Sequence, residues 1–243
     1  MSKLIVVVHG RSASTLVLRM LYSTGVFELW GEPPKGECPA FRNKPENWGR
    51  EAVRREWEKL GAEGRVLAKL PAFAFFLDNL LPLSPDVIVL ERSVVDIVKS
   101  YAALGNVEQV TRLHSLFGVD RLAEEEYAKL GGVVRHDDPY HKIAVVYAWS
   151  HRKVHRDLEG YSRALFIHYM NLMSSPEEVF TRFEEFLGLE SGRHRQKWRV
   201  LMGERHQSTG RPCELGYQKP LRTTIPDESM RRICDAVWRF GYF

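Results

Sequence analysis

An uninterrupted apolar run near the N-terminus, Leu4–Val8, constrains the fold of this chain more than any other feature. The run is rich in β-branched residues and has no polar residue that would face solvent, which is typical of a strand covered on both sides within a parallel sheet. After a short polar loop, the mostly apolar residues 15–22 predict a helix that ends near Gly25. A strand, a loop and a helix in this order predict an α/β protein.

The same alternation continues along the chain. Further strands are predicted at residues 66–70, 86–90 and 163–168, and helices at residues 50–60, 73–81, 94–104, 138–158, 175–187 and 227–240, with a short helix around Trp198 and weakly helical residues 106–134. This order predicts a central parallel β-sheet flanked by helices on both faces, as in P-loop NTPases. Ligands in such folds bind beyond the carboxyl ends of the strands.

Length, charge and cysteine content exclude several classes of protein. The 243 residues, 44% of them hydrophobic, suffice for one domain, residues 1–243, to bury a full core. A net charge of +4 is too small to indicate a nucleic-acid partner. No apolar run approaches the roughly 18 residues of a membrane helix, and three widely spaced cysteines favour free thiols. We expect a cytoplasmic protein with no membrane partner, and the sequence does not indicate its oligomeric state.

The loop between the first strand and the first helix has the composition of an anion site. Its residues are His9, Gly10, Arg11, Ser12, Ala13, Ser14 and Thr15. Backbone N–H groups and the positive end of the helix dipole converge at such a turn, and the arginine and the hydroxyl side chains add further donors. The lysine of the GxxxxGK[ST] motif is missing. Its absence favours a 5'-phosphosulfate over a nucleoside triphosphate, whose γ-phosphate usually requires lysine and magnesium.

A second anion site is predicted after the strand at residues 86–90. Arg92 follows this strand and can bind a phosphate through two parallel hydrogen bonds. Ser100 lies just over two turns into the next helix, and its hydroxyl can face the same ligand if that helix runs past the ribose. The alternative for Arg92 is a surface ion pair with Asp96.

Together these segments resemble the PAPS-dependent sulfotransferases. Residues 11–16 are similar to the 5'-phosphosulfate loop of that family, and residues 87–101 to its 3'-phosphate segment. Lys69 at a strand end, residues 166–172 and the FLG-ended helix at 175–188 extend the resemblance over most of the chain. The departures are Ala13 for the more usual glycine, Ser93-Val94 for an Asp-Pro pair and Tyr169-Met170 for a Tyr-Glu pair.

The resemblance implies transfer of a sulfuryl group from 3'-phosphoadenosine-5'-phosphosulfate (PAPS) to a hydroxyl of a small molecule, a carbohydrate or a tyrosine. It implies Glu32 as the general base, with His9 as the rival, and Lys69 as the group that stabilises the leaving phosphate. Arg211, in a polar loop, is expected at the 3'-phosphate, although Lys219 or Arg222 could take its place. A solvated loop glutamate and a solvated basic loop remain alternative interpretations.

Two other functions stay open at this stage. One is an ATP-dependent small-molecule kinase of the same broad fold, against which the missing loop lysine counts. The other is a catalytically inactive nucleotide-binding protein. The histidines and aspartates within residues 136–141 are of the types that bind metal ions. We interpret them as the capped start of the helix at 138–158 and assign no metal.

Overall fold

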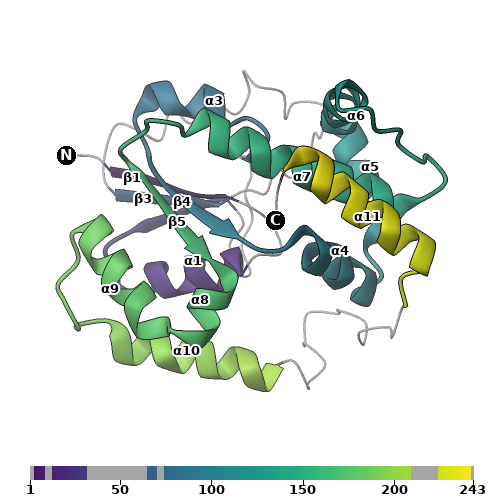
Figure 1. Ribbon diagram of the computed structural model, residues 1–243. Coiled ribbons are helices and arrows are strands. Elements are labelled where there is room, and N and C mark those ends of the chain that lie inside the picture. The colour runs from purple at the N-terminus through teal and green to yellow at the C-terminus, as the bar shows by residue number, and fades with distance from the viewer. Residues whose placement is uncertain (1–2, 9–12, 32–64, 70–73, 209–223, 242–243) are drawn as a thin grey trace. The chain divides into compact units, whose positions relative to one another are not determined.

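The computed structural model describes residues 3–8, 13–31, 65–69, 74–208 and 224–241 (Figure 1). Their contacts divide the chain into two compact units. The sheet unit consists of Met1–Arg42, Arg50–Arg92 and Tyr161–Cys213, and the helical unit of Asn43–Gly49, Ser93–Gly160 and Glu214–Phe243. The single domain expected for the whole chain stays a prediction.

The sheet unit is built on five parallel strands in the order β2-β3-β1-β4-β5. The strands are β1 (Lys3–Val8), β2 (Glu28–Gly31), β3 (Arg65–Lys69), β4 (Asp86–Glu91) and β5 (Ala164–His168). Four of them lie where the sequence predicts strands. The strand β2 is not among the predicted ones, because four residues are too few to show a period. Since all strands are parallel, their carboxyl ends share one edge of the sheet.

Helices of the sheet unit cover one face of the sheet (Figure 1). They are α1 (Ser14–Tyr22), α8 (Tyr169–Ser174), α9 (Pro176–Leu187) and α10 (Arg195–Ser208). Trp198 of α10 is fully buried in their core, donates a 2.7 Å hydrogen bond to the carbonyl of Met20 and lies edge-on to Phe180 at 5.2 Å. The short helix predicted around Trp198 is therefore longer than expected, because this contact holds it against α1 and α9.

The segment between β3 and β4 contains less helix than the sequence predicts. The helix α3 spans only Leu77–Leu80, and the single 3-10 turn Leu81–Leu83 follows it. Pro82 lacks a backbone N–H group, which explains why the α-helix ends at Leu80, one residue before the predicted end; at the start, residues 74–76 lie outside α3. The helix predicted at residues 50–60 lies outside the described residues.

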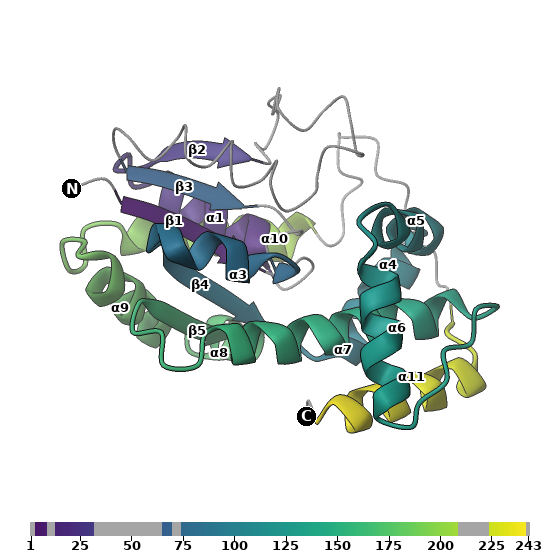
Figure 2. The same cartoon turned by 90° about the horizontal axis from the view of Figure 1, so that it is seen from above.

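The helical unit is organised around one long helix, α7 (Pro139–Asp157), which contacts the four other helices that the structure describes in this unit (Figure 2). These are α4 (Val94–Ala103), α5 (Val107–Leu116), α6 (Val119–Lys129) and α11 (Asp227–Phe240). The weakly helical residues 106–134 thus form two helices. Gly118 separates them at φ 66°, in the left-handed region that favours glycine.

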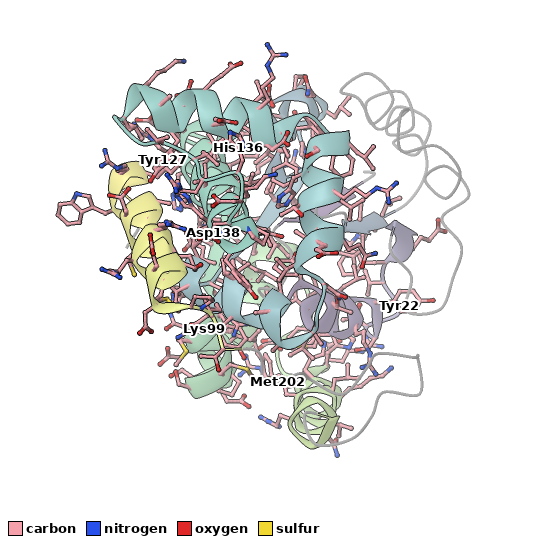
Figure 3. The ribbon with its side chains drawn as sticks, turned by 90° about the vertical axis from the view of Figure 1, so that its right-hand side faces the viewer. Tyr22, Lys99, Tyr127, His136, Asp138 and Met202 are labelled. Carbon is pink, nitrogen blue, oxygen red and sulfur yellow. The ribbon has the colours of Figure 1, made fainter. Side chains whose placement is uncertain are left out.

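The start of α7 confirms the capped helix predicted at residues 136–141. Asp138 is the N-cap, and its Oδ1 accepts a 3.1 Å hydrogen bond from the backbone of His141. Its Oδ2 accepts a 3.0 Å hydrogen bond from Arg232 of α11, and Figure 3 shows Asp138 beside this helix. These contacts give the carboxylate a structural role, joining α7 to α11.

No helix in the described parts of the chain combines the length and the apolar character that a membrane span requires.

Candidate functional site

The turn from β1 to α1 ends in an unusual backbone conformation. Ala13 is the N-cap of α1 and has φ 70° and ψ 16°, in the left-handed region. Residues other than glycine rarely adopt this conformation, and it occurs most often where function requires a particular backbone path. Ala13 occupies the position where the resembling family more often has glycine, and the structure shows why glycine suits it.

Among the residues that the structure describes, none at the N-terminus of α1 supplies a group that usually neutralises a helix start. Ala13 has no side-chain acceptor for the N–H groups of the first turn, and that turn contains no acidic residue. The hydroxyl of Thr15 is on an exposed side chain, whereas Ser14 is buried. The positive end of α1 is therefore suited to an anion, with Thr15 as the accessible side-chain donor of the two.

Arg92 lies at the carboxyl edge of the sheet and has an aromatic partner. It directly follows β4, and its guanidinium lies over the ring of Tyr169, 4.5 Å from the ring centre. Tyr169 directly follows β5, and the last residues of the two strands, Glu91 and His168, pair in register. This contact restricts where the guanidinium can point.

Tyr169 is a functional candidate that the sequence analysis missed. In the sequence, Tyr169 stands out only through the Tyr169-Met170 pair, which departs from the family's Tyr-Glu pair. The signal that could reveal it is its position: Arg92 and Tyr169 each follow the last residue of a strand, and the two strands are neighbours. Sequence alone does not show that β4 and β5 are adjacent.

Ser100 belongs to the helical unit. It is half-buried, two turns into α4, as predicted. The next residue, Tyr101, is buried, and its hydroxyl lies 2.6 Å from that of Tyr147 in α7. Arg92 and Ser100 thus each have a defined environment within their own unit.

Lys69 is the last residue of β3, which confirms its predicted position at a strand end. Its backbone pairs in register with Val7 of β1 on one side and with Gly31 of β2 on the other. In the sequence, His9 follows directly after β1 and Glu32 directly after β2. The three residues considered for catalysis thus end or immediately follow three adjacent parallel strands.

Several predicted site residues lie outside the described residues. They are His9, Gly10, Arg11, Ser12, Glu32 and Arg211. The roles assigned to them stay predictions.

The sheet unit also has an open hollow of about 550 Å³, lined among others by Arg19, Tyr22, Lys197 and Leu201. It lies at the C-terminal end of α1, whereas Ala13 is at the N-terminal end. Lys197 donates a 2.8 Å hydrogen bond to the carbonyl of Ser23 there. This hollow is separate from the candidate anion site.

The described residues form an α/β sheet of five parallel strands, with an anion-suited turn after the first and an arginine after the fourth. The candidate site is therefore at the carboxyl edge of this sheet. No protein-family model matches the sequence, and the comparison with curated proteins finds no match either. Solved structures do match, and the following three of them are sulfotransferases.

One match is the sulfotransferase domain from the curacin biosynthetic pathway, with a TM-score of 0.54 and 13% identity over 100% of this chain and 99% of that one. A sulfotransferase from Alicyclobacillus acidocaldarius matches with a TM-score of 0.51 and 17% identity, over 99% of this chain and 94% of that one. A sulfotransferase from Mycobacterium avium matches with a TM-score of 0.52 and 11% identity, over 99% of this chain and 77% of that one. The chain has the fold of the sulfotransferases.

Proposed function

We propose that this protein transfers a sulfuryl group from PAPS to a hydroxyl of a small molecule, a carbohydrate or a tyrosine, and releases adenosine 3',5'-bisphosphate. The observation that carries the proposal is the Arg92 guanidinium, held over Tyr169 where β4 ends, in a chain with the sulfotransferase fold. A bidentate donor at this edge suits a phosphate. We further expect helices on both faces of the sheet, as in P-loop proteins.

The proposed donor site has two parts. Residues 10–15 bind the 5'-phosphosulfate at the N-terminus of α1, where the described residues of the first turn carry no acidic side chain. Arg92, Ser100 and Arg211 bind the 3'-phosphate. Tyr169 keeps the Arg92 guanidinium oriented toward that phosphate.

The proposed reaction is an in-line displacement at sulfur. The acceptor oxygen forms a bond to sulfur while the bond from sulfur to the oxygen of the 5'-phosphate breaks. The acceptor proton passes to the Glu32 carboxylate, or to His9, and the ammonium of Lys69 stabilises the charge that develops on the leaving phosphate. Lys69 ends β3, and in the sequence His9 and Glu32 directly follow β1 and β2, the strands on either side of β3, which supports this assignment.

The decisive experiment is calorimetric titration with adenosine 3',5'-bisphosphate. The parent should bind, and Arg92→Ala and Arg11→Ala should each bind roughly 10- to 100-fold more weakly, because each loses charge-assisted hydrogen bonds. Arg193→Ala is the matched control, since Arg193 is an exposed arginine of the sheet unit, paired with Glu190. Lack of binding by the intact parent would overturn the proposal.

Turnover distinguishes the proposal from its alternatives. Labelled PAPS with a panel of phenols, sugars and tyrosine peptides should yield a labelled product without added magnesium. A preference for ATP with a magnesium requirement would instead indicate a kinase, and binding without turnover an inactive protein. Glu32→Gln should abolish most turnover while retaining nucleotide affinity; equal turnover would remove Glu32 as the base.

A further inference from the structure

A buried pair of tyrosine hydroxyls joins α4 to α7. The Oη atoms of Tyr101 and Tyr147 lie 2.6 Å apart, and their ring centres are 5.9 Å apart with a tilt of 47°. Both side chains are buried. A short hydrogen bond in such surroundings is costly to break, because water cannot readily replace the lost partner of a buried hydroxyl.

The hydrogen bond is adjacent in sequence to the proposed phosphate ligand. Ser100 precedes Tyr101 in α4, so the two side chains point about 100° apart around the helix axis. Tyr101 is buried toward α7, while Ser100 is half-buried. Turning α4 about its axis by about 10° moves a serine hydroxyl by roughly 1 Å, which is enough to impair a positioned contact.

The apolar packing of α4 is supplemented by a directional contact. The other buried residues of α4 are aliphatic, and their contacts carry little direction: Val94, Ile97, Val98 and Ala102. The hydroxyl pair is directional. On the side of α7, His114 of α5 lies edge-on to the ring of Tyr147, with ring centres 5.8 Å apart. Tyr147 is thus held by a third helix.

From this placement we infer that the Tyr101–Tyr147 hydroxyl pair is a positioning element, which sets the rotation of α4 and thereby aims the Ser100 hydroxyl at the 3'-phosphate of the donor. The inference rests on the proposed function. Neither tyrosine needs to touch the ligand.

The test compares two ligands that differ in the 3'-phosphate. Calorimetry of Tyr147→Phe and Tyr101→Phe should show roughly 3- to 10-fold weaker binding of adenosine 3',5'-bisphosphate. Binding of adenosine 5'-monophosphate, which has no 3'-phosphate, should stay unchanged. Ser100→Ala should give at least the same selective loss, and adding Tyr147→Phe to it should cause no further loss, since both act on one contact.

Two further variants separate positioning from stability. The double variant Tyr101→Phe/Tyr147→Phe leaves no hydroxyl without a partner, so it should regain stability over the single variants but keep the selective loss. The double variant also provides the binding test if a single variant does not fold. Tyr127→Phe is the matched control: Tyr127 is a buried tyrosine of the same unit that donates a 2.5 Å hydrogen bond to Asp235, and its loss should leave the selectivity unchanged.

The outcomes are distinct. A parent that does not bind adenosine 3',5'-bisphosphate contradicts the proposed function itself. If the parent binds and the tyrosine variants bind adenosine 3',5'-bisphosphate with affinities within twofold of the parent's, the positioning inference alone is overturned. Equal losses for both ligands, or a Ser100→Ala variant with full affinity, overturn it as well.

Discussion

Ala13 shows at the scale of one residue how the turn from β1 to α1 restricts the sequence. Its backbone at φ 70° costs an alanine roughly 1–2 kcal/mol, but its methyl group is buried and contributes about 0.8 kcal/mol. Ala13→Gly should therefore raise the free energy of unfolding by up to about 1 kcal/mol. Ala13→Val should lower it by more than about 2 kcal/mol, because a β-branched residue fits this region worse. Urea denaturation measures both, and a tolerated valine would contradict the conformation.

The contact between Arg92 and Tyr169 gives a second prediction at this scale. Tyr169→Phe keeps an aromatic ring under the guanidinium and should bind adenosine 3',5'-bisphosphate within about threefold of the parent. Tyr169→Leu removes the ring and should bind roughly 3- to 10-fold more weakly, since a cation–π contact contributes about 0.5–2 kcal/mol. Calorimetry gives both affinities. If the two variants behave alike, the ring does not position the arginine.

At the scale of elements, several ion pairs join α9 to α10, and the one between Glu184 and Arg195 is the most buried of those described. Glu184 is buried, and its carboxylate accepts hydrogen bonds from Nε of Arg195 at 3.0 Å and from the backbone of Gly192 at 2.9 Å. The pKa of Glu184 lies below its usual value, and the hydrogen bond from the Arg195 guanidinium is the main cause. The pair therefore fixes the connection through which α10 brings Trp198 into the core.

Breaking this pair from one side should be costly. Arg195→Ala leaves a buried carboxylate without its cation and should lower the free energy of unfolding by about 3 kcal/mol. Glu184→Gln keeps a side-chain acceptor and should cost less. Arg193→Ala, at the exposed pair with Glu190, should cost less than about 1 kcal/mol. These differences are measured by urea denaturation, and equal effects of Arg195→Ala and Arg193→Ala would show that the buried pair adds nothing.

At the scale of the whole molecule, buried histidines link stability to pH. Burial lowers the pKa of His114 from 6.5 to about 4, with Asp120 of α6 opposing the shift and Lys142 of α7 adding to it. The pKa of His141 is also lowered, mainly by burial. Between pH 6.5 and 4 the unfolded chain binds protons that the folded one does not. Stability is therefore complete above pH 6.5 and decreases as pH falls through this window.

The size of this effect can be measured with one substitution. A shift of this size corresponds to about 3 kcal/mol for His114. Urea denaturation at pH 7.5 and at pH 4.5 should show a clear loss in the parent and a smaller loss in His114→Gln, in which the contribution of His141 remains. An unchanged pH dependence in the variant would show that His114 titrates normally in the folded protein.

The sequence could predict the strands, helices and caps that residues close together in the chain encode. The apolar run at Leu4–Val8 lies within β1, Asp138 caps α7, and the helix at Asp227–Phe240 has its predicted ends, since periodicity and capping act within a few residues. The loop at residues 10–15, Arg92 and Ser100 were predicted as phosphate ligands because a phosphate site needs donors at fixed spacings, and this role stays a prediction. The roles of the residues outside the described parts stay predictions.

Only the tertiary structure decided the features that join distant parts of the chain. It revealed β2, whose last residue pairs with Lys69, the ring of Tyr169 under the Arg92 guanidinium, and the hydroxyl of Tyr147 that holds α4. The partners in these contacts lie far apart in the sequence. The physical reason is that a short strand or a buried hydroxyl is stabilised by the partner that folding brings to it, and no local pattern encodes that partner.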